Sequence, residues 1–468
     1  MLDADPIASF AAALRGQLIQ RSDPDYDDAR ALYNGMIDKR PRLIARCAGT
    51  ADVIAAVDFG RDQGLRLAVR GGGHNGAGFG SCDDGLVIDL SRLRGIRVDP
   101  RQRTIRVEAG CTLGDLDHAA HAFGLALPSG IMSTTGIAGL TLGGGHGYLS
   151  RAHGLTIDNL LEADVVLADG TFVTASASDN AELFWALRGG GGNFGVVTSF
   201  LFRAHAVTQV YGGPIFWRIE DAEQVMRFYR DFMRSRPPRE LSPFLGLQKV
   251  PASAPFPEEL WGVPTCSLVT CYAGAAEEGE RAMRPIREGL PPPLLDWMSE
   301  MPYPTLQTLF DGLMPKGLQW YWRGDFVHDL PDAAIDIHID YAKRVPGELS
   351  TMHLYPIDGA VHDLPADATA WRCRDATWSM VIAGIDRDPG NAKALKDWSR
   401  SYWAAVHPFN RSGAYVNFMM DDEGPGRVEA TYGANHARLA RAKHRYDPAN
   451  LFNCNVNIPP AAPTRSAD

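Results

Sequence analysis

Four glycine-rich segments within the first 200 residues constrain this chain more than any other feature of its sequence. They are Arg70–Gly80, Gly136–Gly147, Gly154 with the nearby Asp158-Asn159, and Arg188–Gly195. Glycine lets backbone N–H groups come close to a ligand and adopt positive φ angles. Successive N–H groups in such loops form concave anion sites that suit a pyrophosphate. Tight turns without a ligand explain one such run equally well, but four runs in one region favour a bound ligand.

Two of these segments match the pattern G-x-G-x-x-G, at Gly71–Gly76 and Gly190–Gly195. A nicotinamide dinucleotide site requires a strand before this pattern and a helix after it. The first match follows an expected strand at 65–70 but leads into further loop and another strand. The second follows an expected helix at 182–187 and precedes a strand at 196–203, which is the reverse order. Neither match supports a Rossmann site, and the sequence has no G-x-x-x-x-G-K-[ST] phosphate loop.

The composition is that of an ordinary globular protein, with 45% hydrophobic and 22% charged residues among 468. At roughly 100–200 residues per domain, we expect two or three folding units. The net charge of −10 argues against nucleic acid as a partner and provides no attraction to anionic membranes. Seven cysteines without a C-x-x-C pair predict neither a disulfide framework nor a metal site. With no basic, apolar leader and no run of about 18 apolar residues, we expect a cytoplasmic protein.

Periodicity divides the chain near residue 206. Up to that point, short strands alternate with helices and glycine loops, whereas from 207 to about 385 the glycine runs disappear. The expected elements before the boundary are an amphipathic helix at 5–20, strands at 42–48, 65–70, 85–90 and 104–108, helices at 50–63 and 113–123, and a hairpin at 163–174 that turns at Asp169-Gly170.

His74 lies inside the first glycine run, in Arg70-Gly-Gly-Gly-His74-Asn75. A lone histidine in a loop is usually a polar surface residue. Here the neighbouring glycines would let it approach a ligand, and imidazole is a nucleophile able to form a covalent adduct.

With these residues identified, the match to a known family is specific. The segment from Arg70 to Asn75, followed by Gly85–Ser91, resembles the FAD-binding segment of the berberine bridge enzyme-like oxidases of the vanillyl-alcohol oxidase superfamily. The segments 133–147, 158–170 and 182–195 agree with the same family. The tail is also similar to that family, at Tyr415-Val-Asn417 and from Tyr432 to Ile458. The resemblance covers most of residues 37–458.

The resemblance implies an α+β fold in three parts. Residues 1–206 would form a two-subdomain FAD-binding domain, and residues 207–414 a substrate domain with an antiparallel sheet covered by helices. Residues 415–468 would be the C-terminal segment of the family, which returns to the FAD domain.

The resemblance also implies how FAD is held. The histidine that matches His74 is bonded to the flavin 8α-methyl carbon, and many members add a bond from a cysteine at the position of Met132. We therefore expect a single covalent link, through His74. The other residues assigned to FAD are Arg70, Gly71, Gly72, Gly73, Asn75, Gly76, Ser133, Thr134, Thr135, Gly136, Gly139, Leu140, Gly143, Gly144, Gly147, Tyr148, Gly195, Val196, Val197, Asn455 and Asn457.

The expected catalytic residues are Tyr415 and Asn417. Berberine bridge enzyme uses a glutamate base on a central strand of the substrate domain, and the matching position here looks like Ile382. Related oxidases use the tyrosine of a Tyr-x-Asn motif, which is Tyr415 in this sequence, and Asn417 would orient substrate or bond the flavin. A tyrosine base needs partners that depress its pKa from about 10. The alternative is a tyrosine that only packs on the sheet.

For the substrate we expect an aromatic or otherwise apolar wall. Trp378, Met380 and Ile382 alternate along one strand and would face the flavin, with Trp322 from Trp320-Tyr321-Trp322 opposite. Core packing explains these side chains equally well. Such a lining suits an apolar or aromatic ring better than a long sugar chain.

Together these features predict an FAD-dependent oxidase that takes a hydride from a small organic alcohol or amine. Molecular oxygen would reoxidise the flavin to give H2O2, because the residue that gates oxygen in this family matches Thr135, which is no larger than valine. The alternatives are a dehydrogenase with another electron acceptor and a catalytically inactive flavin-binding protein. We expect a monomer or homodimer.

Overall fold

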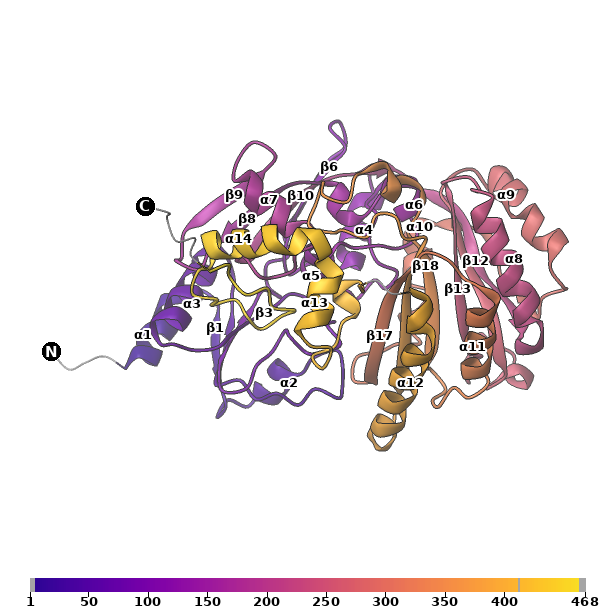
Figure 1. Cartoon of the computed structure of the whole chain (residues 1–468). Helices are drawn as coiled ribbons and strands as arrows, with labels where there is room; N and C mark the ends of the chain where they lie inside the picture. The colour runs from indigo at the N-terminus through magenta and orange to yellow at the C-terminus, as the bar shows by residue number, and fades with distance from the viewer. Residues whose placement is uncertain (1–4, 411–412, 463–468) are drawn as a thin grey trace.

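The computed structural model describes residues 5–410 and 413–462, which form two lobes side by side (Figure 1). The first lobe contains the N-terminal 200 residues together with the C-terminal segment. The second lobe is built on one large sheet. Their junction is the setting of the site described below.

The first subdomain holds a four-stranded sheet in the order β1-β2-β4-β3. Strands β2, β4 and β3 are parallel and β1 is antiparallel to β2, and α3 lies between β2 and β3 in the chain. The bounds are β1 Gln17–Gln20, β2 Leu43–Arg46, α3 Thr50–Asp62, β3 Leu67–Arg70 and β4 Leu86–Asp89, with α2 at Tyr26–Arg30. Strand β3 leads directly into the first glycine run.

The single helix expected at 5–20 is wrong. The structure has a short helix α1, Pro6–Ala13, followed by strand β1. The carboxylate of Asp52 accepts hydrogen bonds from the N–H groups of Arg15 and Gly16, both at 2.9 Å. A Cβ atom at Gly16 would lie 2.1 Å from the carbonyl oxygen of Arg46. The close approach of the two backbones is what turns this segment into a strand.

The second subdomain is a five-stranded antiparallel sheet in the order β5-β6-β10-β8-β9. Strands β8 and β9 form the expected hairpin, with Gly170 at φ 84° in its turn. The bounds are β5 Ile96–Asp99, β6 Thr104–Glu108, β8 Leu160–Val166, β9 Phe172–Ser176 and β10 Val196–Arg203, with helices α4 Leu113–His121, α5 Ile137–Gly143, α6 Ser150–His153 and α7 Ala181–Leu187 and the strand pair β7 Leu125–Ala126 and β11 His205–Ala206.

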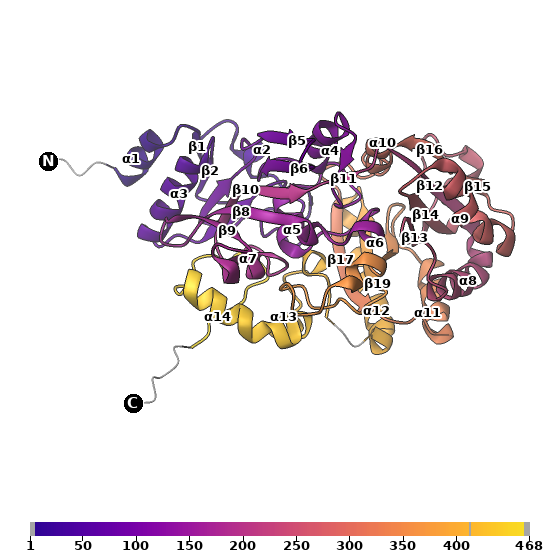
Figure 2. The same ribbon diagram turned by 90° about the horizontal axis from the view of Figure 1, so that it is seen from above.

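The second lobe is an antiparallel sheet covered by helices, as predicted. Its strands follow the order β15-β12-β14-β13-β18-β19-β17, and β16 also pairs with β12. Helices α8, α9, α11 and α12 cover one face, and the other face meets the first lobe (Figures 1 and 2). The bounds are β12 Gln209–Arg218, α8 Ala222–Arg234, β13 Leu241–Lys249, β14 Pro264–Tyr272, α9 Ala276–Gly289, β15 Leu295–Asp296, β16 Ser299–Pro302, α10 Tyr303–Gln307, β17 Gln319–Val327, α11 Asp332–Ala342, β18 Thr351–Pro356, β19 Trp378–Asp386 and α12 Ala392–Asn410.

The C-terminal segment crosses back from the sheet to the first lobe, where α14 lies beside α7 (Figure 2). It contains a 3-10 turn η6 at Val416–Phe418, then α13, Pro425–Tyr432, and α14, His436–Tyr446. The Nζ atom of Lys443 donates hydrogen bonds to the carbonyl oxygens of Asn193 and Phe452 and pairs with Asp447 at 2.6 Å. This buried ion pair fixes the tail against the glycine loop at 190–195.

Two kinds of feature are missing from the described parts of the chain, 5–410 and 413–462. They contain no helix long and apolar enough to cross a membrane. Nor do they contain a group of three or more His, Cys, Asp or Glu side chains placed to hold a metal ion.

Candidate active site

A cavity lies between the lobes, with glycine loops on one side and the uncovered face of the large sheet on the other. The sequence-predicted cofactor residues that line it are Arg70, Gly71, Gly72, Gly73, His74, Asn75, Thr135, Gly136, Gly139, Leu140, Gly195, Val197 and Asn455. Tyr415, Asn417 and Trp322 line the same cavity. Residues far apart in the chain therefore converge on one site.

His74 lies at the wall of this cavity. Its ring stacks on Tyr33, with centroids 3.7 Å apart, and its Nε2 atom is 3.0 Å from Oγ1 of Thr134. Burial lowers the pKa of His74 to about 4, so the imidazole is neutral at neutral pH and keeps a lone pair. Tyr33 is held in turn by a hydrogen bond from its hydroxyl to the carbonyl of Met314. No periodic pattern of residues around Tyr33 points to a role at the site.

The glycine loops leave room for a large ligand. A Cβ atom added at Gly139 or Gly192 would meet nothing within 4 Å, and both residues line the cavity. Gly191 has a φ of 72°, in the region that favours glycine. Nη1 of Arg70 and Oδ1 of Asn455 are buried without a protein partner, although both residues line the cavity. Open backbone and unpartnered polar atoms fit a ligand with a pyrophosphate and polar ring atoms, as FAD has.

Nine residues that we assigned to FAD lie outside the cavity lining. Three of the glycines are needed because side chains pack on them: an added Cβ would lie 2.4 Å from Trp322 at Gly76, 2.3 Å from Asn417 at Gly143 and 2.3 Å from Trp371 at Gly144. Of the remaining six, Gly147 faces the carbonyl of Ser129, the Ser133 hydroxyl donates to Asp311, and Thr134 contacts His74. Tyr148 and Val196 are core residues, and Asn457 is the sixth.

Tyr415 and Asn417 form one hydrogen-bonded unit at the start of η6. The Tyr415 hydroxyl accepts hydrogen bonds from the N–H of Gly145 at 3.0 Å and from Nδ2 of Asn417 at 2.8 Å. Asn417 also donates to the carbonyls of Gly139 and Leu140. Burial raises the pKa of Tyr415 to about 12, although both donors act to lower it. The expected depression of this pKa is therefore wrong for the protein alone, because burial outweighs the two N–H groups.

His146 is a residue of the site that sequence reasoning missed. It lies within the second glycine run and lines the cavity, with its ring centroid 4.6 Å from Tyr415 and 5.2 Å from Tyr355. Burial lowers its pKa to about 3, and Nε2 has no partner among the described residues. Its position between glycines in Gly143-Gly-Gly-His-Gly147 was the available signal.

The prediction of which face of β19 meets the flavin is wrong. Trp378, Met380 and Ile382 point away from the cavity into the core beneath the helices, where Nε1 of Trp378 donates to the Tyr229 hydroxyl at 2.9 Å. The cavity is lined instead by the alternate residues Val381, Ala383 and Ile385. Since successive side chains of a strand point to opposite faces, an offset of one residue exchanges the two sets. The cavity-facing residues of β19 are aliphatic, so this strand provides no carboxylate base.

The rest of the sheet wall is mainly aromatic. Strand β17 contributes Trp320 and Trp322, with ring centroids 5.7 Å apart. Other side chains that line this part of the cavity, and that the sequence did not identify, are Phe310, Met314, Thr351, His353, Tyr355 and Phe418.

Known proteins agree with this architecture. Residues 41–176 match the family described as FAD binding domain, and residues 414–459 match the family described as berberine and berberine like. An FAD-linked oxidoreductase of Dictyostelium discoideum is 32% identical over 460 residues, which is 97% of each chain. The chain belongs to the berberine bridge enzyme-like family of FAD-linked oxidoreductases.

Two further comparisons concern the same activity class within this berberine bridge enzyme-like family. The (R)-6-hydroxynicotine oxidase of Paenarthrobacter nicotinovorans is 28% identical over 470 residues, covering 96% of this chain and 97% of the relative. The crystal structure of 6-hydroxy-D-nicotine oxidase from Arthrobacter nicotinovorans superposes with a TM-score of 0.86 at 26% identity, over 98% of this chain and all of that one. The cofactor of the present protein is therefore FAD, and the protein is an oxidoreductase.

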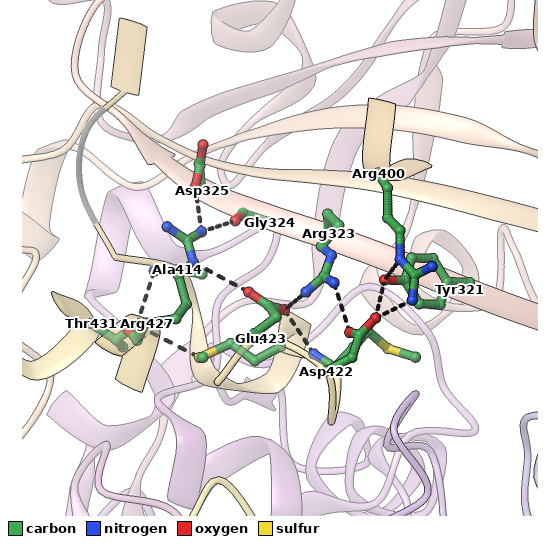
Figure 3. A network of polar contacts seen from close by, with 12 residues as sticks. Tyr321, Arg323, Gly324, Asp325, Arg400, Ala414, Asp422, Glu423, Arg427 and Thr431 are labelled. Carbon is green, nitrogen blue, oxygen red and sulfur yellow. Dashed lines mark hydrogen bonds and ion pairs between the residues drawn. The ribbon is translucent and has the colours of Figure 1, made fainter. Parts of the chain in front are cut away.

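A network of ion pairs connects the segment that carries Tyr415 to the large sheet (Figure 3). Arg323 of β17 pairs with Asp422 at 2.7 Å and with Glu423 at 3.0 Å. Arg427 of α13 pairs with Glu423 at 3.2 Å and with the fully buried Asp325. Arg323, Glu423 and Arg427 are all at least nine-tenths buried, so the network holds the two elements at a fixed distance.

In this berberine bridge enzyme-like protein, the residues around the cavity have separable tasks. FAD, when bound, supplies the acceptor for a hydride. The glycine loops and Asn455 would hold the cofactor, in the cavity that His74 also lines. The apolar sheet wall excludes water, which strengthens every polar interaction at the site. The Tyr415 hydroxyl, held by Gly145 and Asn417, is placed to exchange a proton with a bound molecule.

Proposed function

We propose that this protein is an oxidase that removes a hydride from a small hydroxyl or amino compound to FAD held covalently on His74. The observation that carries the proposal is the convergence of Tyr415 and Asn417 on the cavity that also contains His74 and the open glycine loops. Removal of hydride from carbon requires that a proton leave the neighbouring O–H or N–H. The described residues that line the cavity include no Asp or Glu, so Tyr415 is our choice for the group that takes this proton.

The contacts of Tyr415 support this role. Its oxygen accepts two N–H hydrogen bonds, an arrangement that stabilises a developing phenolate. Because the pKa of the free group is about 12, the phenolate is a minor species at neutral pH. The rate of hydride transfer should therefore increase with pH.

Two observations support a single covalent bond. His74 is neutral and half-buried, which leaves its imidazole nucleophilic. Met132 lines the cavity at the position where other members have a second, cysteinyl link. The cavity does include Cys454, but its Sγ contacts the Ser81 carbonyl at 3.5 Å and burial raises its pKa, so this thiol stays protonated.

Oxygen as the electron acceptor and a cytoplasmic location are parts of the same proposal. Thr135, the position expected to gate oxygen, lines the cavity with a small side chain. All seven cysteines are free and buried, which suits a reducing compartment. We further expect a monomer or homodimer.

One experiment tests the proposal in two stages. Photoreduced enzyme is mixed with air-saturated buffer, and the reoxidation of the flavin and the formation of H2O2 are followed. Rapid reoxidation with one H2O2 per flavin is expected, whereas flavin that stays reduced until a quinone dye is added would show a dehydrogenase. Anaerobic screening of small aromatic alcohols and amines then identifies compounds that bleach the flavin. A protein that is reduced by light but by no compound of these classes would contradict the proposed reaction.

A further inference from the structure

Two polar side chains, His353 and Tyr355, form a hydrogen-bonded pair in the wall that the large sheet presents to the cavity. Both are on β18, both are buried, and both line the cavity. They are two residues apart on a strand and so share a face. Nδ1 of His353 and the Tyr355 hydroxyl are 2.7 Å apart. Thr351 of the same strand also lines the cavity, but its hydroxyl is bonded to Leu247 and Gln248.

The pair is neutral and only half satisfied. Burial lowers the pKa of His353 to about 3 and raises that of Tyr355 beyond its usual range. Within the described residues, neither side chain makes another hydrogen bond. Whichever atom supplies the shared proton, one donor and one acceptor remain. A hydrogen-bonding valence left free in an otherwise apolar wall favours a ligand with a polar group that fills it.

The surroundings of the pair define what can bind there. Phe244 lies 5.1 Å from His353 and 5.0 Å from Tyr355 between ring centroids, and Phe418 lies 6.1 Å from Tyr355. Arg70 is the one charged side chain other than histidine among the described residues that line the cavity. It ends β3 of the first lobe, pairs with Asp89 at 2.8 Å and leaves Nη1 free on the side of the glycine loops, so it is not part of the sheet wall. The wall therefore offers no partner for a charged group, whose burial without a partner is strongly unfavourable.

We propose that His353 and Tyr355 bind one hydroxyl group of a compact, otherwise apolar ring and so determine which substrates this enzyme accepts. A hydroxyl can donate or accept a hydrogen bond, so it can fill the valence that the Tyr355 oxygen leaves free whichever way the pair shares its proton, while Nδ1 of His353 holds that oxygen in place. The ring packs against Phe310 and Phe418, which line the cavity, and Phe244 lies behind the pair. The inference rests on the proposed function only in that substrate occupies this cavity. It disfavours oligosaccharides, whose many hydroxyls would be buried without partners.

The chain contains a matched control for this pair. His338 of α11 and Tyr402 of α12 form a second buried pair, with Nδ1 and the hydroxyl 2.6 Å apart. Neither residue is among those that line the cavity. Tyr355→Phe and Tyr402→Phe therefore delete the same atom from the same kind of hydrogen bond, once inside the cavity and once outside it.

The experiment measures binding to the oxidised holoenzyme through changes in flavin absorbance, so it does not depend on turnover. The probes are 4-chlorophenol, its isostere 4-chlorotoluene, and the anion 4-chlorobenzoate. We expect wild type and Tyr402→Phe to prefer the phenol over both others by about tenfold or more. Tyr355→Phe should lose most of the preference for phenol over toluene while its affinity for 4-chlorotoluene changes little. His353→Asn is a second variant at the same pair, expected to act in the same direction.

Three results would overturn the inference. They are a wild type that binds neither neutral probe or does not prefer the phenol, a preference that survives in Tyr355→Phe and His353→Asn, and an equal loss in Tyr402→Phe. Failure of the proposed function would look different, because it concerns flavin reduction and reoxidation, and these probes report binding alone.

Discussion

Replacing Tyr415 with phenylalanine separates its chemistry from its packing. The ring remains, and only the hydroxyl is lost. That oxygen accepts hydrogen bonds from Gly145 N–H and from Asn417. Asn417 keeps the carbonyls of Gly139 and Leu140 as acceptors, whereas Gly145 N–H loses its partner. One buried unsatisfied donor costs about 1–3 kcal/mol of stability, so the variant should still fold.

The kinetic effect should be larger than the effect on stability. Loss of a general base typically lowers the rate by about 10²–10⁴-fold. A phenol with a pKa of about 12 is ionised to the order of 10⁻⁵ at pH 7, and this fraction increases tenfold with each pH unit. Flavin reduction by wild type should therefore become faster from pH 7 to 10, whereas the rate for Tyr415→Phe should be nearly independent of pH.

Anaerobic stopped-flow reduction with an identified substrate measures both effects. Tyr432→Phe is the control, because Tyr432 is another buried tyrosine of the C-terminal segment and does not line the cavity. Its rate and pH profile should match wild type. A rate for Tyr415→Phe within about threefold of wild type, or an unchanged slope with pH, would show that another group or water takes the proton.

Three other predictions concern the cofactor, the thiols and the ion-pair network. In acid-denatured protein the FAD mass should stay attached, and His74→Ala should release its flavin and melt at a lower temperature; release of all flavin from wild type would contradict the covalent link. Titration of denatured, unreduced protein should find seven thiols, since all seven cysteines are free in the structure, and two or more missing thiols would refute this. Glu423→Gln leaves Arg323 and Arg427 without that carboxylate, so the free energy of unfolding measured with denaturant should fall by about 3–5 kcal/mol. Flavin reduction should also become slower, while the FAD mass stays attached. The control is Lys393→Ala, in an exposed pair with Asp397, which should change neither the free energy of unfolding nor the rate of flavin reduction. Equal effects of the two variants would show that the network does not position the segment that carries Tyr415.

The location of the cofactor site could be predicted from the sequence because it depends on the local conformation of the backbone. Glycine runs indicate backbone conformations that few other residues adopt, and His74 lies inside one of these runs. The resemblance extended this reading to Tyr415 and Asn417, which the structure brings to the cavity with His74. The antiparallel sheet covered by helices was likewise predicted from the resemblance, and the structure contains it.

The substrate side was decided by tertiary structure alone. Every residue of β19 from Trp378 to Ile385 is buried, because helices cover one face of the sheet and the first lobe covers the other. A strand buried on both faces has no polar alternation to show which face meets the cavity, so the prediction for Trp378, Met380 and Ile382 selected the wrong one. Tyr33, His146 and His353 escaped notice for a related reason. Tyr33 and His353 look ordinary in their own segments, and only the glycines around His146 mark it. The packing of the two lobes places all three around one cavity.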